Sequence, residues 1–245
     1  MKNLALAFCS IRPSQYPDNV CDNREKEYLR SLKQLQRVLP KSFDLLVCEN
    51  TIDDAGQIKN DDLRDFLNDT EMCATGSESN MGTANKGMGE LALLKSGLDQ
   101  IDPDEYENIA YVTGRQFYTC PYVFERTERL EKDALLSYPD FVFLDGRVQE
   151  NEKGRLFNDM FFSMKSDKMV MYADYSIQQM DYNIQNQIGS EYNLYDFVER
   201  NNIEYEWLDF LGLIRNDWQR NNNASDISNY HCLLYTSDAA DDLIG

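Results

Sequence analysis

A loop rich in glycine and asparagine, a helical pattern and a short apolar run succeed one another in residues 80–115 and constrain the fold most. Leucines at positions 91, 94 and 98 follow the three- and four-residue spacing of an amphipathic helix. After a turn at 102–104, the apolar run at 109–112 is typical of a buried strand. A helix that leads through a tight turn into a buried strand is half of an α/β unit, so the sequence predicts an α/β fold.

The N-terminal part of the chain predicts a strand, a helix and a second strand. Residues 4–8 and 43–48 are short apolar runs, and between them apolar residues recur at helical spacing up to Leu39, where Pro40 stops the pattern. Such a βαβ unit places the loops that follow its two strands side by side. We therefore expect a single Rossmann-like domain over residues 1–215, with a mostly parallel central sheet flanked by helices.

Elsewhere the pattern is weaker. Residues 51–79 are acidic and polar with a short helical pattern around Leu63, and we interpret them as a solvated loop, with a lid over the site as the alternative. Further along, the sequence predicts a charged surface helix at 122–135, strands at 141–144 and 156–164, a helix at 166–172 and a helix that starts at Glu191.

The C-terminal segment differs in character. Residues 216–245 are expected to form a poorly ordered tail, and 232–245 resemble a translated sequencing adapter, so they do not enter the fold prediction. The single histidine, His231, borders this segment. Histidine-dependent triads and zinc hydrolysis are therefore disfavoured.

The charge balance restricts the partners. With 43 Asp and Glu against 24 Lys and Arg, the chain carries a net charge of −19. Nucleic acids and anionic membrane surfaces are bound by clustered Lys and Arg, so both are disfavoured as partners. No apolar run reaches the length of a membrane span.

The six cysteines are far apart and show no CxxC spacing. Cys9 and Cys48 lie in predicted buried strands, which favours reduced thiols in the core over a disulfide framework or a zinc site. We therefore expect a cytoplasmic protein.

Several familiar motifs are missing. The loop after the first strand, residues 9–13, contains no glycine and cannot be the GxGxxG turn of a dinucleotide site. The patterns GxxxxGK[ST] and GxSxG are also absent from the sequence.

Polar residues gather where ligands bind in open α/β sheets, at the carboxyl ends of the strands. These strand ends carry Ser10 and Arg12, then Glu49, and finally Thr113, Gly114 and Arg115. The loop before the central helix offers backbone N–H groups to an anion and contains Asn80, Gly82, Asn85, Lys86 and Gly87.

In the order of these motifs the chain resembles GT-A-type glycosyltransferases, particularly the bacterial nucleotide-sugar transferases of surface-polysaccharide pathways. The resemblance lies in the spacing Asn80-x-Gly82 and Asn85-x-Gly87 before a helix and in the strand that follows. It extends, more weakly, to Phe161-Phe-Ser-Met-Lys165 and to the segment that begins with Ser190-Glu191.

The resemblance implies roles for these residues. Ser10, Arg12 and Glu49 would hold the nucleoside of the donor, and the Asn/Gly loop and the following strand end would hold the sugar diphosphate. The family usually carries Asp-x-Asp at that strand end and binds Mg²⁺ or Mn²⁺ there. This sequence has Thr113-Gly114-Arg115 instead, which leaves metal dependence open. Arg115 could neutralise the diphosphate through its guanidinium, or it could pair with a carboxylate as part of the structure.

Two acids are candidates for the catalytic base. Glu191 matches the family's acidic segment, although it could be only a first-turn acid at a helix N-terminus. Asp145 ends an apolar run, although it could be only a turn residue before Gly146.

The function implied is transfer of a sugar from a nucleotide-sugar donor to a hydroxyl of a glycan or small-molecule acceptor, in the synthesis of surface polysaccharide or another glycan. The main alternative is a non-catalytic nucleotide- or glycan-binding domain of the same fold. A nucleotidyltransferase would need a basic glycine-rich loop near the N-terminus, which the sequence lacks.

Overall fold

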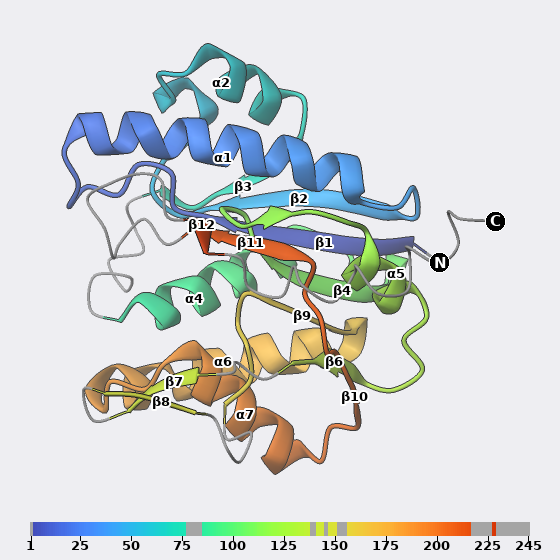
Figure 1. The fold of residues 1–245 in the computed structure, drawn as a ribbon. Helices are drawn as coiled ribbons and strands as arrows, with labels where there is room; N and C mark the ends of the chain where they lie inside the picture. Colours follow the sequence, from blue (N-terminus) through green and yellow to red (C-terminus); the bar gives the residue numbers. More distant parts are fainter. Residues whose placement is uncertain are drawn as a thin grey trace, which may run out of the picture.

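The computed structural model describes residues 2–76, 85–137, 141–144, 147–150, 156–216 and 227–228. Its centre is a seven-stranded sheet with the strand order β10-β6-β9-β4-β1-β2-β3 (Figure 1). The strands are β1 (Lys2–Cys9), β2 (Phe43–Glu49), β3 (Glu71–Ala74), β4 (Tyr106–Thr113), β6 (Ala134–Leu136), β9 (Phe161–Lys165) and β10 (Tyr205–Trp207). Strand β9 pairs antiparallel with β4 and β6, whereas the other pairings described in this sheet are parallel. The predicted fold class is confirmed.

Helices cover both faces of the sheet (Figure 1). One face carries α1 (Asp18–Val38) and α2 (Asp61–Asn68), and the other carries α4 (Lys86–Leu98), α6 (Ser166–Gln185) and α7 (Ser190–Asn201). In β1 the even-numbered side chains from Leu4 to Phe8 join the core under α4, α6 and α7, and the odd-numbered ones from Ala5 to Cys9 join the core under α1. Strand β1 is therefore buried on both faces, as a continuous apolar run in a parallel sheet requires.

Shorter elements surround this centre. They are η1 (Ala55–Gln57), η3 (Pro103–Glu105), β5 (Phe117–Tyr118), α5 (Tyr122–Glu128), β7 (Phe141–Leu144), β8 (Arg147–Glu150), β11 (Leu213–Asn216) and β12 (Ile227–Ser228). Strands β5, β11 and β12 form a three-stranded sheet, and β7 and β8 form a two-stranded one. Apart from Asn216 and β12, the expected tail at 216–245 lies outside the described residues, so its disorder stays a prediction.

The solvated loop expected over residues 51–79 is wrong for the middle of that segment. Helix α2 buries Leu63, Phe66 and Leu67 and packs against α1, and β3 adds a parallel strand beside β2. Strand β3 has four residues, of which only Cys73 is buried. So short a strand at a sheet edge leaves no alternating apolar pattern to recognise.

Two later elements also differ from expectation. The surface helix predicted at 122–135 ends at Glu128, and Ala134–Leu136 instead forms β6, completely buried in the central sheet. Strand β7 pairs with β8 in the small sheet, so the described part of 141–144 is not a strand of the central sheet. Asp145 itself lies outside the described residues, and the reason for placing it at the edge of the central sheet is lost.

Four of the cysteines are buried, in agreement with the expectation of thiols in the core. Cys9, Cys21, Cys48, Cys73 and Cys120 are free thiols, and the first four are buried. Within the described ranges, no helix combines the length and the apolar character needed to cross a bilayer.

Candidate active site

The carboxyl ends of β1, β2 and β4 lie together at one edge of the sheet. Cys9 pairs with Glu49 across β1 and β2, and Phe8 pairs with Thr113 across β1 and β4. The loops after these strands are therefore neighbours, which the βαβ pattern predicted for the loops after β1 and β2. Since β9 runs in the opposite direction, its amino end reaches the same edge.

Glu49 ties the first two loops together. Its completely buried carboxylate accepts hydrogen bonds from the backbone N–H of Ile11 at 3.0 Å and of Thr51 at 2.6 Å, and from the Thr51 hydroxyl. Burial raises the pKa of Glu49 to about 7, against the opposing effect of the hydrogen bonds from Thr51 and Ile11. The Glu49 carboxylate therefore holds the loops after β1 and β2 together. The contact of Glu49 with a nucleoside stays a prediction.

Ser10 and Arg12 face different partners. The Ser10 hydroxyl donates to Asn50 Oδ1 at 2.7 Å, close to the sheet edge. The Arg12 guanidinium instead forms ion pairs with carboxylates of α1, namely Asp18 at 3.0 Å, Asp22 at 3.1 Å and Glu25. A nucleoside would have to compete with these carboxylates for Arg12, whereas Ser10 lies beside a carboxamide that could also contact a ligand.

Gly114 allows the end of β4 to pass close to β1. A Cβ atom at this position would lie 2.5 Å from Cys9 Sγ and 3.0 Å from the Phe8 carbonyl oxygen, which accepts a hydrogen bond from the Gly114 N–H at 2.9 Å. A side chain there would force the Cys9 thiol to shift and press on the Phe8 carbonyl, which is held in the sheet. The strand end is therefore held rigidly next to the loop after β1.

Arg115 follows directly and is only partly buried. Its backbone carbonyl accepts a hydrogen bond from the Ser31 hydroxyl of α1 at 3.0 Å. Among the described residues its guanidinium forms no ion pair with a carboxylate. The structural ion pair that was the alternative for Arg115 is thus not seen in the described part of the chain.

The residues at this strand end do not fit a metal ion. Thr113, Gly114 and Arg115 offer no carboxylate where Asp-x-Asp would stand. The described residues also contain no group of three histidine, cysteine, aspartate or glutamate side chains placed to hold a metal. Dependence on Mg²⁺ or Mn²⁺ is implied by the resemblance alone and stays untested.

The N-terminus of α4 is bound to the connection between α6 and α7. Asn85 caps α4, since its Oδ1 accepts the Met88 N–H at 3.4 Å, and its Nδ2 donates to the Ile188 carbonyl at 2.8 Å. Lys86 is exposed, and its ammonium lies 3.5 Å from Glu90 one turn further on. Asn80 and Gly82, the earlier part of the predicted phosphate loop, lie outside the described residues.

Gly87 brings α4 and α7 into direct contact. A Cβ atom at Gly87 would lie 2.7 Å from the Ser190 backbone nitrogen and 3.0 Å from Ser190 Oγ. Gly87→Ala should therefore lower the free energy of unfolding by about 1–3 kcal/mol, the usual cost of overpacking. In an exposed helix position the same substitution stabilises by roughly 0.5–1 kcal/mol. Urea unfolding followed by circular dichroism measures the sign, and a more stable variant would contradict the close packing of the two helices.

Ser190 does not cap α7. The N-cap is Gly189, and the Ser190 hydroxyl donates to Asp159 Oδ2 at 2.6 Å. The Glu191 side chain folds back over the same turn, because a Cβ at Gly189 would lie 2.7 Å from Glu191 Oε2. The charge of Asp159 and then burial raise the pKa of Glu191 to about 7. Glu191 is thus a carboxyl group that changes protonation near neutral pH.

Asp159 is the site residue that the sequence analysis missed. It lies two residues before β9, next to the end of β4, since the Thr113 N–H donates to the Met160 carbonyl at 3.1 Å. Glu90 completes an acidic group with Asp159 and Glu191, and accepts a hydrogen bond from the Tyr111 hydroxyl at 3.2 Å. The sequence did show an acid two residues before an aromatic strand. Only the antiparallel direction of that strand, however, brings Asp159 to the site.

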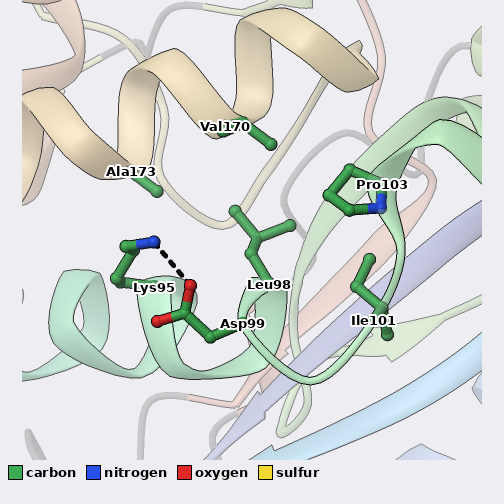
Figure 2. A pocket seen from close by; sticks show the side chains of 7 residues that line it. All are labelled: Lys95, Leu98, Asp99, Ile101, Pro103, Val170 and Ala173. Atoms are coloured by element: carbon green, nitrogen blue, oxygen red, sulfur yellow. Dashed lines mark hydrogen bonds and ion pairs between the residues drawn. The ribbon is translucent and has the colours of Figure 1, made fainter.

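A surface pocket of about 240 Å³ lies elsewhere, between α4 and α6 (Figure 2). It is lined by Lys95, Leu98, Asp99, Ile101, Pro103, Val170 and Ala173. The Lys95 ammonium contacts Asp99 at 2.5 Å and Asp174 at 3.4 Å. Pro103 precedes the first residue of β4, so this pocket lies at the opposite, amino end of that strand and is not part of the candidate site.

No protein-family model and no curated protein matches this sequence. Among solved structures, one described as a nucleotide-diphospho-sugar transferase from Desulfovibrio desulfuricans G20 superposes with a TM-score of 0.51 at 13% identity, over 85% of this chain and 80% of that one. The bifunctional IspDF from Campylobacter jejuni gives a TM-score of 0.51 at 12% identity, over 86% of this chain and 50% of that one. Mouse xyloside xylosyltransferase 1 in its apo form gives a TM-score of 0.48 at 12% identity, over 85% and 84%. At such identities the likeness shows the fold alone, a mixed α/β fold like that of nucleotide-sugar transferases.

Proposed function

We propose that this protein is a glycosyltransferase that moves a sugar from a nucleotide-sugar donor to a hydroxyl of an acceptor, in the synthesis of a glycan such as surface polysaccharide. The proposal is supported by two groups of opposite charge near the carboxyl ends of the strands, since Arg115 directly follows β4 and Glu191 follows Ser190, which is hydrogen-bonded to Asp159 before β9. Arg115 offers a guanidinium without a carboxylate partner in the described residues, and Glu191 offers a carboxyl group with a pKa of about 7. These are the two groups that sugar transfer from a diphosphate needs.

The donor is assigned to the loops after β1, β2 and β4. In this assignment its nucleoside lies near the Ser10 hydroxyl and the Asn50 carboxamide, which form a hydrogen-bonded pair at the edge. Its diphosphate lies between Arg115 and the N-terminus of the 13-residue helix α4, where the helix dipole favours negative charge. A bidentate contact from Arg115 would supply positive charge without a cation.

The acceptor is assigned to the α7 side of the edge, where Glu191 acts as general base. As the acceptor oxygen forms its bond to the anomeric carbon, the proton of its hydroxyl passes to the Glu191 carboxylate. The bond between that carbon and the diphosphate oxygen breaks, and the electron pair leaves with the nucleoside diphosphate, whose charge Arg115 stabilises. A base with a pKa of about 7 suits this step, because it is partly ionised at neutral pH and still binds a proton well.

A panel of nucleotide sugars with simple glycan acceptors tests the proposal. The expected result is release of nucleoside diphosphate with at least one donor, together with a rise in the melting temperature on donor binding. A non-catalytic binding domain would show the rise in melting temperature and release no nucleoside diphosphate. Release of pyrophosphate from a nucleoside triphosphate would instead identify a nucleotidyltransferase.

A further inference from the structure

We propose that Asp159, anchored by the Ser190 hydroxyl at the first turn of α7, is a positioning residue for the neighbouring Glu191 carboxyl group. The inference rests on the proposed function for its catalytic meaning, but the protonation of Glu191 can be measured without turnover. The inference gives a role to Asp159, which the sequence analysis did not identify, and to Ser190, which does not cap its helix.

The backbone around Asp159 is held from several sides. The Asn158 N–H donates to the Ser137 carbonyl at 2.8 Å, and the Met160 N–H donates to Asn158 Oδ1 at 3.0 Å. The Met160 carbonyl accepts hydrogen bonds from the Thr113 N–H and the Tyr118 hydroxyl, both at 3.1 Å. The backbone of Asp159 is therefore fixed relative to the sheet edge.

The first turn of α7 is fixed in the same way. Ser190 is only 4% exposed, and its hydroxyl reaches Asp159 Oδ2 at 2.6 Å. The contact of Ser190 with Gly87 prevents the turn from moving toward α4. The Asp159 carboxylate is therefore held beside the residue that precedes Glu191, and since like charges repel, it disfavours the ionised form of Glu191.

Other charged and titratable groups face this turn from the elements packed around it. They are Lys86 and Glu90 of α4, Tyr111 of β4 and Tyr172 of α6. Lys86 favours the ionised form of Glu191, but its side chain is 73% exposed and also contacts Glu90. Asp159 is the largest cause of the raised pKa of Glu191, ahead of burial and of Glu90.

The experiment is a titration of the Glu191 carboxyl by ¹³C NMR, with the resonance assigned by its loss in Glu191→Gln. In Asp159→Asn the midpoint should fall by about one pH unit or more, because the repelling charge is gone. Asp159→Glu keeps the charge and should leave the midpoint closer to that of the unsubstituted protein. The acid limb of the pH–rate profile should move to lower pH together with the midpoint.

Ser190→Ala provides a second variant in case Asp159→Asn does not fold. Without its anchor the Asp159 carboxylate can turn toward solvent, so the Glu191 midpoint should fall in the same direction. An unchanged midpoint in a folded Asp159→Asn or Ser190→Ala protein would overturn the inference, even if sugar transfer is found. A lowered midpoint in a protein that transfers no sugar would support the inference and reject the proposed function instead.

Discussion

Glu191→Gln should slow sugar transfer by about 10²–10⁴-fold, the usual contribution of a general base. Gln has nearly the same shape as Glu but cannot accept the acceptor's proton. Donor affinity should hardly change, because Glu191 is assigned to the proton of the acceptor hydroxyl and not to the donor. Initial rates of nucleoside diphosphate release and calorimetric titration with the donor measure the two quantities separately.

The stability of the Glu191→Gln variant shows whether slower transfer results from the loss of the base or from unfolding of the protein. The pKa of Glu191 is about 7 in the folded protein and near 4.5 for an unperturbed glutamate. The folded state thus keeps a proton that the unfolded state releases, so the stability contributed by this group falls as the pH rises from about 4.5 through 7. At pH 8 the substitution removes a destabilising charge, and the variant should unfold no more easily than the unsubstituted protein.

Glu199→Gln is the matched control, since Glu199 lies on the same helix with its side chain exposed. It should leave transfer unchanged. Near-normal transfer by Glu191→Gln would reject Glu191 as the base and move the role to another acid, with Asp145 the remaining candidate from the sequence. Equal losses of donor binding and transfer would mean that Glu191 positions the donor.

Arg115→Ala should weaken donor binding by roughly 10–100-fold, the effect of losing a hydrogen bond from a charged group to the diphosphate. Arg115→Lys keeps the charge but loses the planar fork, so it should weaken binding to a smaller extent. Stability should not change, because no carboxylate in the described residues pairs with this guanidinium. Calorimetry with the nucleoside diphosphate and thermal unfolding measure the two effects.

Arg30→Ala is the control for a general loss of positive charge. The Arg30 side chain is exposed on α1, and its guanidinium lies 5.6 Å from the ring centre of Phe117, two residues after Arg115. It should leave nucleoside diphosphate binding within a factor of about 2–3, since an exposed charge is screened by salt. If Arg115→Ala binds normally but melts at a lower temperature, Arg115 is a structural residue and the diphosphate site lies elsewhere.

The elements that the sequence predicted well are those whose own residues carry a complete pattern. The apolar run of β1 is buried on both faces, and the leucines at 91, 94 and 98 face the core from α4. Thr113, Gly114 and Arg115 could be placed at the sheet edge, since a parallel strand that leaves the core must end there. The resemblance to GT-A-type enzymes added the expectation of the fold, which the structure confirms.

The elements that the sequence predicted poorly depend on a partner far along the chain. Strand β3 exists because β2 offers it an edge, and Ala134–Leu136 became a strand because it pairs with β9 and β10. The local residues of both segments are compatible with several structures. Pairing across the sheet decides among them, and no local periodicity records it.

By itself the sequence therefore determined which strand ends carry polar residues and that Glu191 opens a helix late in the chain. Only the tertiary structure decided that β9 runs against its neighbours, which brings Asp159 to the same edge and within 2.6 Å of the Ser190 hydroxyl. It also decided that Arg12 is occupied by carboxylates of α1, while Arg115 has no such partner among the described residues. The physical reason is that strand direction and ion pairing depend on which distant residues meet, whereas burial and helix spacing depend on the residues of one segment.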